Sequence, residues 1–237
     1  MRLIIDLGNT NVKLAVFKNN NIYEVFIKRK VSKLVIKNIM NSYPSIDTVF
    51  LCTTNPKNKI GKSVFADYKV RFFDFNSIDN LLISSSYNGQ LGEDRIALSK
   101  AGMVFYGKNV LIIDLGTCIT YDLVYEEKHE GGQISLGLQA RLNSLFKSTK
   151  NLPRLDFEHP RAFIGKSTED CILSGVFFGI LSEIELMIKR YTKDRELEII
   201  ITGGDSKYFQ KHMKNVIFDD NLLMKGLNCI LNENITN

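Results

Sequence analysis

The stretch Leu3-Ile4-Ile5-Asp6-Leu7-Gly8-Asn9-Thr10 decides the fold, because its first six residues recur in the same order as Leu111-Ile112-Ile113-Asp114-Leu115-Gly116. In each copy an apolar run ends in Asp-Leu-Gly and small polar residues, and a second apolar run follows. Apolar runs separated by a polar turn that contains glycine predict a strand, a tight turn and a second strand. The repeat itself predicts two similar halves.

The turn in each copy has the composition of an anion-binding site. Gly8 and Gly116 lack a Cβ, so a ligand can approach the backbone closely. The small polar residues beside them offer N–H and O–H donors to phosphate oxygens. Asp6 and Asp114 lie at the ends of their predicted strands, where a carboxylate can hold a hydrated cation. The alternative is a buried hairpin with a glycine turn, but a repeated hexapeptide arises by accident far less often than a single short motif.

Composition excludes several classes of protein. A hydrophobic content of 44% with 24% charged residues indicates an ordinary globular core. The net charge of +5 suits an anionic ligand without requiring one. The basic residues are spread along the chain without interleaved aromatic residues, so we expect no nucleic-acid binding. No C-x-x-C is present, the amino terminus has no signal-peptide pattern, and no apolar run approaches the ~20 residues that span a bilayer. These features predict a cytoplasmic protein that does not enter a membrane.

The remaining elements follow from periodicity and capping signals. In the first half we expect three antiparallel strands in residues 2–28, a helix from Ser32 to about Met40, a strand at 48–52, a weak helix ending at Ala66 and a strand at 70–73. Residues 74–92 form a polar loop that is typical of a ligand site, and a helix runs from about Glu93 through Phe105. This order predicts a mixed sheet covered by helices.

The second half repeats the pattern. We expect strands at 110–114, up to 125 and at 130–135, a helix at 138–146, a polar loop at 147–166 and a long helix from Ser167 to about Arg190 that carries Gly175 and Gly179 four residues apart. The segment Gly131–Gly137 is expected to allow a close backbone approach. A strand at 197–201 ends in Thr202-Gly203-Gly204-Asp205, a turn suited to an adenosine or a phosphate, and a short strand at 216–218 and a helix at 221–231 close the chain.

Two such turns facing each other resemble the actin, heat-shock ATPase and sugar-kinase superfamily, and the whole set of motifs resembles type III pantothenate kinase. The resemblance implies an α/β fold of two similar ribonuclease-H-like halves, each a mixed sheet with helices, with an ATP cleft between them. The halves would be residues 1–107, with the first phosphate turn and the pantothenate loop, and 108–237, with the second phosphate turn and a dimer helix. The matching pieces are Asp6-Leu7-Gly8-Asn9-Thr10, Tyr87, Leu91-Gly92-Glu93-Asp94-Arg95, Asp114-Leu115-Gly116-Thr117 with Thr120 and Asp122, Gly131-Gly132-Gln133-Ile134, Thr168 and Thr202-Gly203-Gly204.

The chain departs from the family pattern at two positions. Cys118 stands where the family usually has Ala, and Leu136 stands where a Pro is common. Both replacements are apolar, so they put the shape of a loop in doubt rather than the chemistry.

The resemblance implies transfer of the ATP γ-phosphoryl group to pantothenate, giving 4′-phosphopantothenate in the first step of coenzyme A biosynthesis. Asp94 would accept the hydroxyl proton; the alternative is an acidic residue that only complements the helix dipole in the first turn. Arg95, the backbone of Gly92 and Glu93, and Tyr87 would bind pantothenate, although Tyr87 could instead be a loop anchor. The implied ATP contacts are Asp6, Leu7, Gly8, Asn9, Thr10, Asn11, Val12, Lys13 and Thr117.

The resemblance also implies cations and a partner. Asp114 would be the ligand of a monovalent cation, K⁺ or NH₄⁺, and Mg²⁺ would accompany ATP. Thr168 would reach the pantothenate site of a neighbouring subunit, which implies a homodimer. The alternative is that Thr168 only follows Ser167 at the start of a helix.

Two other functions remain open at this point. A kinase or phosphatase of the same superfamily that acts on a sugar or polyphosphate would not account for Tyr87 together with Gly92-Glu93-Asp94-Arg95. A non-catalytic regulator that binds a nucleotide would be favoured by loss of Asp94 or of either phosphate turn, and all three are present.

Overall fold

A computed structural model describes residues 1–53, 60–78, 84–89 and 91–235. Within those residues the chain forms two five-stranded sheets. It divides into two compact units, the first comprising Met1–Val104 with Asn221–Asn237 and the second Phe105–Asp220. Part of the expected polar loop, at 79–83 and 90, lies outside the described residues, as does the segment 54–59 before the weak helix.

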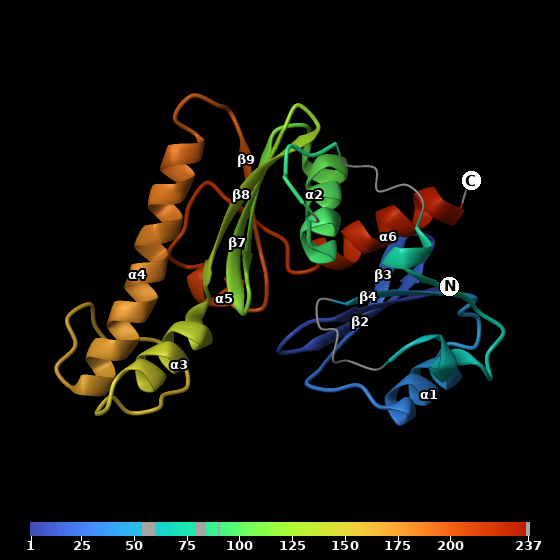
Figure 1. The fold of residues 1–237 in the computed structure, drawn as a ribbon, viewed down its shortest axis with the longest axis horizontal. Coiled ribbons are helices and arrows are strands. Elements are labelled where there is room, and N and C mark those ends of the chain that lie inside the picture. Colours follow the sequence, from blue (N-terminus) through green and yellow to red (C-terminus); the bar gives the residue numbers. More distant parts are fainter. Residues whose placement is uncertain (54–59, 79–83, 90, 236–237) are drawn as a thin grey trace. The chain divides into compact units, whose positions relative to one another are not determined.

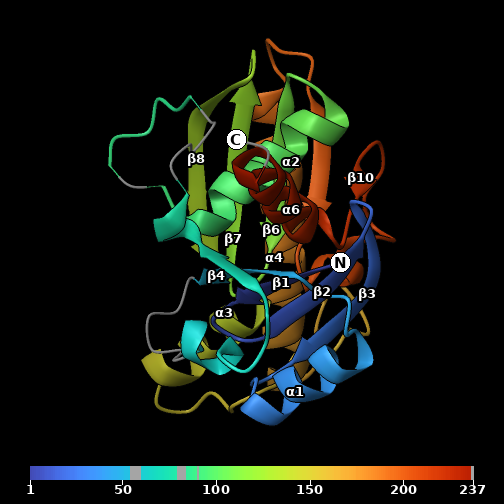
Figure 2. The same cartoon turned by 90° about the vertical axis from the view of Figure 1, so that its right-hand side faces the viewer.

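The first unit contains a mixed sheet with the strand order β3-β2-β1-β4-β5 (Figure 2). Strand β1 pairs antiparallel with β2 and parallel with β4, and β4 pairs parallel with β5. The β2–β3 turn places Asn19 and Asn20 at φ of 51° and 65°, the left-handed pair that a two-residue hairpin of matching twist requires. The elements are β1 (Arg2–Leu7), β2 (Val12–Lys18), β3 (Asn21–Lys28), α1 (Lys33–Ser42), β4 (Thr48–Thr53), the 3₁₀ turns η1 (Lys62–Phe65) and η2 (Phe75–Ser77), β5 (Arg71–Asp74) and α2 (Glu93–Tyr106).

Both faces of this sheet are covered, which explains why β1 is an unbroken apolar run. Alternate residues point to opposite faces: Leu3 and Ile5 lie in the cluster that includes Ile36 of α1, whereas Ile4 lies in the cluster that includes Ala97 of α2. Ser32 caps α1, as expected, by accepting a hydrogen bond from the Val35 N–H at 3.4 Å.

The last helix, α6 (Leu222–Ile235), packs within the first unit, whereas the sequence-based boundary at 107 and 108 placed it in the second half. A Cβ at Gly226 would lie 1.9 Å from the Ala97 carbonyl oxygen, so the backbones of α6 and α2 are in direct contact. The Arg2 guanidinium donates to Asn228 at 3.2 Å, and Lys100 forms an ion pair with Glu233 at 2.7 Å. These contacts join the two ends of the chain, and no local sequence pattern reports them.

The second unit repeats the arrangement, with the strand order β10-β9-β6-β7-β8. Figure 1 labels β7, β8 and β9 of this sheet. Strands β6, β7 and β8 form antiparallel hairpins, and β6 pairs parallel with β9. Read from β8, this order matches that of the first sheet read from β3, so the predicted repeat is confirmed. The elements are β6 (Val110–Leu115), β7 (Cys118–Tyr125), β8 (Lys128–Leu136), α3 (Leu138–Ser148), α4 (Thr168–Tyr191), β9 (Glu198–Thr202), α5 (Ser206–Phe209) and β10 (Ile217–Phe218).

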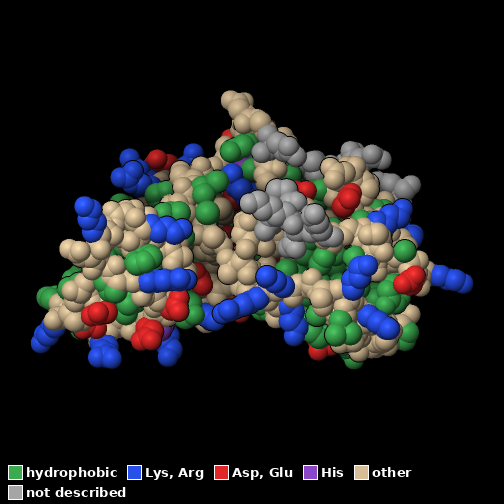
Figure 3. All heavy atoms as spheres, turned by 60° about the horizontal axis from the view of Figure 1, so that its bottom comes forward, with side chains coloured by type: hydrophobic (Ala, Val, Ile, Leu, Met, Phe, Trp, Pro, Cys, Tyr) green, Lys and Arg blue, Asp and Glu red, His purple; other side chains and the backbone are tan. Residues whose placement is uncertain are grey.

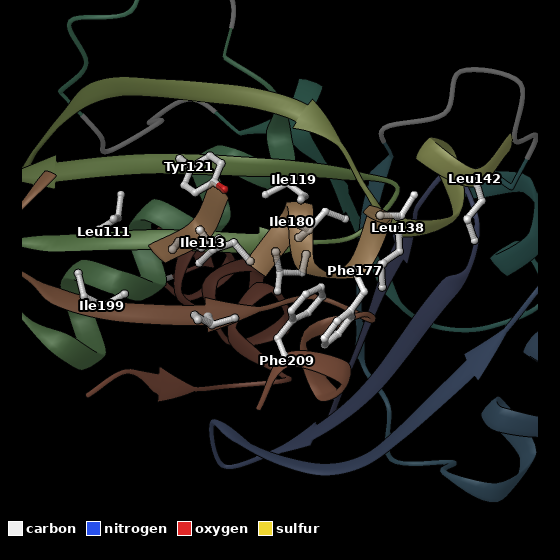
Figure 4. Close-up of a cluster of buried hydrophobic side chains, with 14 of the residues drawn as sticks. Leu111, Ile113, Ile119, Tyr121, Leu138, Leu142, Phe177, Ile180, Ile199 and Phe209 are labelled. Carbon is white, nitrogen blue, oxygen red and sulfur yellow. The ribbon is translucent and has the colours of Figure 1, made fainter. Parts of the chain in front are cut away.

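The core of the second unit lies between its sheet and the helices α3 and α4 (Figure 4). Leu111, Ile113 and Tyr121 come from the sheet, and Phe177 and Ile180 from α4, all of them 1% exposed or less. Helix α4 is the one helix of the described chain that is long and apolar enough to cross a membrane by length and composition, although no apolar run of that length was expected. Its buried apolar residues belong to this core, and 39% of the apolar window is buried.

A polar network links α4 to strands β7 and β8 of the same sheet and to α3. The Glu183 carboxylate accepts hydrogen bonds from Tyr121 Oη at 3.1 Å and from Ser135 Oγ at 2.6 Å, and it pairs with Arg141 of α3. Burial alone would raise the pKa of Glu183, but the hydrogen bonds from Arg141 and Ser135 outweigh it and lower that pKa. The network therefore holds a charged glutamate where the apolar core ends.

The Lys and Arg residues, which are spread along the sequence, are also spread over the face shown in Figure 3. On this face, Lys and Arg side chains are dispersed among acidic and apolar ones and do not gather in one basic patch.

The Gly131–Gly132 pair lies inside β8 and not in a turn, so the close backbone approach expected for this segment occurs at its end, at Gly137.

Candidate active site

Asp6 lies on β1 between two neighbours that matter for the site. In register it faces Lys13 of β2 on one side and Cys52 of β4 on the other, and only 7% of Asp6 is exposed. The four residues 8–11 connect β1 to β2, as expected for the first phosphate turn. Parallel pairing puts the carboxyl ends of β1 and β4 at one edge of the sheet, the edge where ligands bind in open α/β sheets.

The start of α2 brings two carboxylates to this unit's site. Asp94 is half-buried, and its Oδ1 accepts a hydrogen bond from the Arg95 N–H at 2.9 Å. A Cβ at Gly92 would lie 2.6 Å from that oxygen, so glycine at this position makes room for the carboxylate. The Glu93 carboxylate points elsewhere, because its Oε2 accepts a hydrogen bond from the Thr53 N–H of β4 at 2.9 Å.

Tyr87 and Arg95, both of which the resemblance assigns to pantothenate, lie together. The Arg95 guanidinium carbon is 5.3 Å from the centre of the Tyr87 ring, a cation–π distance. Arg95 is only 6% exposed, whereas Tyr87 is 41% exposed. The pair therefore offers a buried planar cation beside an accessible aromatic ring, which suits a ligand with a carboxylate and an apolar part.

The electrostatics of this cluster are acidic. Burial, and then the charges of Asp6, Glu93 and Asp94, raise the pKa of the Cys52 thiol. The pKa of Glu93 is raised mainly by burial and further by Asp74 and Asp94, while hydrogen bonds from Thr53 and Cys52 oppose the change. Several carboxylates near one point attract a cation or a proton, the two species that phosphoryl transfer to a hydroxyl must manage.

The second unit carries the matching turn. Gly116 and Thr117 connect β6 to β7, and the Gly116 N–H donates to the Cys118 carbonyl at 3.0 Å. The Gly137 N–H donates to the Thr117 carbonyl at 3.0 Å, and a Cβ at Gly137 would lie 2.0 Å from the Gly116 carbonyl oxygen. The Thr117 side chain is exposed, so its hydroxyl is accessible to a ligand.

Asp114 is packed against the glycine turn that follows β9. Gly203 has a φ of +99°, and a Cβ there would lie 2.4 Å from both Asp114 Oδ1 and the Leu115 carbonyl oxygen. Within the described residues no group of three His, Cys, Asp or Glu side chains is arranged to hold a metal ion. A cation at Asp114 would thus take its other ligands from backbone carbonyls, water or phosphate.

Sequence reasoning did not single out four residues that lie beside these sites. Cys52 and Thr53 adjoin Glu93, and their position at the end of a strand was the available signal. Asp74 was named only within the polar loop at 74–92, and Asp205 only within the turn suited to an adenosine or a phosphate. Asp205 lies beside the second phosphate turn, with its N–H donating to the Leu115 carbonyl at 2.9 Å, and burial raises its pKa to about 6.

Thr168 is the first residue of α4 and is exposed, behind Ser167, whose Oγ accepts a hydrogen bond from the Asp170 N–H at 3.1 Å. It belongs to the second unit, whereas Tyr87 and residues 92–95 belong to the first.

Solved structures place this fold in a known class. A conserved Baf family protein from Campylobacter jejuni superimposes with a TM-score of 0.64 at 23% identity, covering 99% of this chain and 100% of its own. A protein assigned as a 2-dehydro-3-deoxygalactonokinase from Sinorhizobium meliloti gives 0.59 at 9% identity, covering 98% and 99%. The chain thus shares the α/β fold of these solved structures, and each of its two units carries an Asp-Leu-Gly hairpin.

Sequence comparison then gives the family. The profile of type III pantothenate kinase matches residues 2–190. A type III pantothenate kinase from Christiangramia forsetii is 42% identical over 245 aligned positions, covering 100% of both chains. The chain belongs to the type III pantothenate kinase family, which confirms the resemblance drawn from the motifs.

The raised pKa of Asp205 predicts how stability depends on pH. The folded pKa of about 6 exceeds the ordinary value of 3.8, so the folded state holds the proton more tightly. The charged form is therefore unfavourable in the fold, and stability falls as pH rises from about 4 to about 6. We expect Asp205→Asn to stabilise the protein at pH 7.5 by about 1–2 kcal/mol, after allowing for partial exposure, and by less at pH 4.5.

Urea unfolding at the two pH values measures this difference. Asp156→Asn, at an exposed position, is the control and should show no such change between the two pH values. A loss of stability at both pH values for Asp205→Asn would mean that the carboxylate makes a stabilising contact, and the expectation would be wrong.

Proposed function

We propose that this chain transfers the γ-phosphoryl group of ATP to the primary hydroxyl of pantothenate, giving 4′-phosphopantothenate for coenzyme A biosynthesis. The single observation that carries the proposal is family membership over most of the chain. Both Asp-Leu-Gly hairpins and the Gly92–Arg95 segment are intact, as a working member of the family requires.

Each unit supplies one phosphate turn in this proposal. Phosphoryl transfer depends on positioning and on neutralising the phosphate charge, not on covalent chemistry with the protein. In the first unit, residues 6–13 bind the phosphates, and Lys13 beside Asp6 provides a positive charge. In the second unit, Thr117 provides a hydroxyl, and the turn from Gly203 to Asp205 adjoins it through Leu115. The domain roles expected from the sequence stay part of this proposal, with α6 assigned to the first unit.

Asp94 is the proposed proton acceptor. It is half-buried at the start of α2, next to the Arg95 and Tyr87 pair that we assign to pantothenate. Glu93 is the neighbouring acid, but its carboxylate is directed to β4 and accepts from Thr53. Arg95 suits the pantothenate carboxylate because a guanidinium can bind it with two parallel hydrogen bonds, and the backbone of Gly92 and Glu93 would contact the rest of the substrate.

The family requires a divalent metal with ATP, which Mg²⁺ would supply, and Asp6 is a carboxylate at the edge where it would act. We assign a monovalent cation, K⁺ or NH₄⁺, to Asp114. The Leu115 carbonyl oxygen lies close to the Asp114 carboxylate, since both crowd the same point at Gly203, and such oxygens suit a hard cation. A bound cation there would offset phosphate repulsion.

A homodimer is the proposed assembly. Gly175 and Gly179 are exposed on α4, and a Cβ at either would meet nothing within 4 Å in the described chain. Thr168 begins the same helix, so a partner chain packed on this face would bring it near a second subunit. We place the protein in the cytoplasm, where ATP and pantothenate are available.

The first test is a coupled ADP-release assay. We expect ADP release only when ATP, Mg²⁺ and pantothenate are all present. Equal release without pantothenate would indicate a plain ATPase, release with a sugar in place of pantothenate would indicate another kinase of the superfamily, and no turnover with intact ATP binding would indicate a regulator.

Asp94→Asn tests the proton acceptor. Turnover should fall by a factor of about 10² to 10⁴, the usual contribution of a positioned base, while ATP affinity barely changes. Stability should fall by no more than ~0.3–1 kcal/mol, the value of one helix-dipole contact. The control is Glu169→Gln, which removes an exposed acid from the first turn of α4. Normal turnover in Asp94→Asn with a lowered melting temperature would make Asp94 a helix-capping acid only.

Asp114→Asn tests the cation. Wild-type activity should rise with K⁺ or NH₄⁺ and not with Na⁺ at matched ionic strength, because Na⁺ is smaller and holds its water more tightly. The variant should lose this dependence along with the charge at the site. The assignment fails if Na⁺ alone supports full activity in the wild-type protein.

A further inference from the structure

The side chain of Glu93 binds the end of a strand. Its Oε2 accepts a hydrogen bond from the Thr53 N–H at 2.9 Å, and the Cys52 thiol donates a second hydrogen bond to the same side chain. Cys52 is 0% exposed, so this contact is made inside the first unit. We call Cys52, Thr53 and Glu93 the β4–α2 clasp. The sequence indicated only that the backbone of Glu93 contacts substrate, so this role of its side chain is new.

The clasp joins two segments that carry the proposed chemistry. Cys52 lies beside Asp6 in the parallel pairing of β4 with β1, and Thr53 lies beside Leu7. Glu93 immediately precedes Asp94 and Arg95 in the first turn of α2. The carboxylate of Glu93 therefore ties the start of α2 to the strand pair that holds the first phosphate turn. A displacement of about 1 Å at a reacting group can lower turnover about 10²-fold.

We infer that Glu93 is a positioning residue, which acts through the clasp to hold Asp94 and Arg95 in register with Asp6. This inference rests on the proposed function. Glu93 works through its side-chain oxygens and touches β4 rather than the reacting atoms.

The charges and donors around Glu93 show what holds its carboxylate in place. Burial is the main effect that disfavours the charged form of Glu93, and Asp74 and Asp94 disfavour it further. Hydrogen bonds from Thr53 and Cys52 oppose those effects, so the carboxylate is held in place by its two donors and not by a neighbouring cation in the described chain. Removing the acceptor removes this hydrogen-bonded link at the strand end, while the apolar cluster that includes Phe50 of β4 and Ala97 of α2 remains.

The experiment compares Glu93→Ala with Glu93→Gln. The amide oxygen of Gln can still accept from the Thr53 N–H, whereas Ala cannot. We expect turnover in Glu93→Ala to fall 10- to 100-fold with the KM for ATP changed less than twofold, and Glu93→Gln to restore turnover to within about threefold of the wild type. Asp67→Asn is the control: it removes an exposed acid of the first unit that is not part of the clasp, and it should keep normal turnover.

A second readout does not depend on activity. Amide hydrogen exchange at Thr53 should be at least 10-fold faster in Glu93→Ala and close to wild type in Glu93→Gln. If Glu93→Ala fails to fold, Cys52→Ala serves in its place, because it removes one of the two hydrogen bonds to Glu93. Cys52→Ser keeps a donor at this position, so its exchange at Thr53 and its turnover should be closer to those of the wild type than those of Cys52→Ala. Failure of the proposed function would appear separately, as wild-type protein without pantothenate-dependent ADP release but with the same exchange pattern.

Three results would overturn the inference. Faster exchange at Thr53 with normal turnover would make the clasp a structural contact only. An equal loss of turnover in Glu93→Gln and Glu93→Ala would show that the charge of Glu93, and not its position, matters to the reaction. Unchanged exchange at Thr53 in Glu93→Ala would show that the carboxylate does not hold β4.

Discussion

The rest of the structure depends on one constraint: the first strand of each unit pairs in parallel with a strand that comes later in the chain. β1 pairs with β4, and β6 pairs with β9. Parallel strands bring their carboxyl ends to the same edge, so Asp6 lies beside Cys52, and Asp114 lies beside Thr202. The acidic residue of each Asp-Leu-Gly turn thereby acquires neighbours from a distant segment, and those neighbours differ between the units.

In the first unit this edge is rich in carboxylates. Burial, and then the charges of Asp6, Glu93 and Asp94, disfavour ionisation of the Cys52 thiol. The repulsion among these carboxylates must be offset when the unit folds. The structure offsets it with hydrogen-bond donors, from Thr53 to Glu93 and from the backbone of Arg95 to Asp94. In the proposed function this edge receives a metal-bound phosphate and a proton, and both would lower the repulsion further.

In the second unit the same edge is built from close backbone contacts. Gly137 and Gly203 allow carbonyl oxygens to crowd around the Gly116 turn, and Asp205 is hydrogen-bonded to Leu115 from the far side. The two units share a strand order but not a site chemistry: side-chain carboxylates dominate the first and backbone carbonyls the second. This division matches the proposed assignment of proton transfer to the first unit and of the monovalent cation to the second.

The sequence by itself determined the repeat, the order of strands and helices, the caps at Ser32 and Ser167, and the family. Those features rest on local periodicity and on short motifs, which a single chain displays in full. Only the tertiary structure decided that α6 packs beside Ala97 in the first unit, that Glu93 binds Thr53, and that Asp205 is half-buried beside the second turn. Each of these depends on contacts between segments separated by dozens of residues or more, where the free energy comes from burial and hydrogen bonding that no local pattern reports.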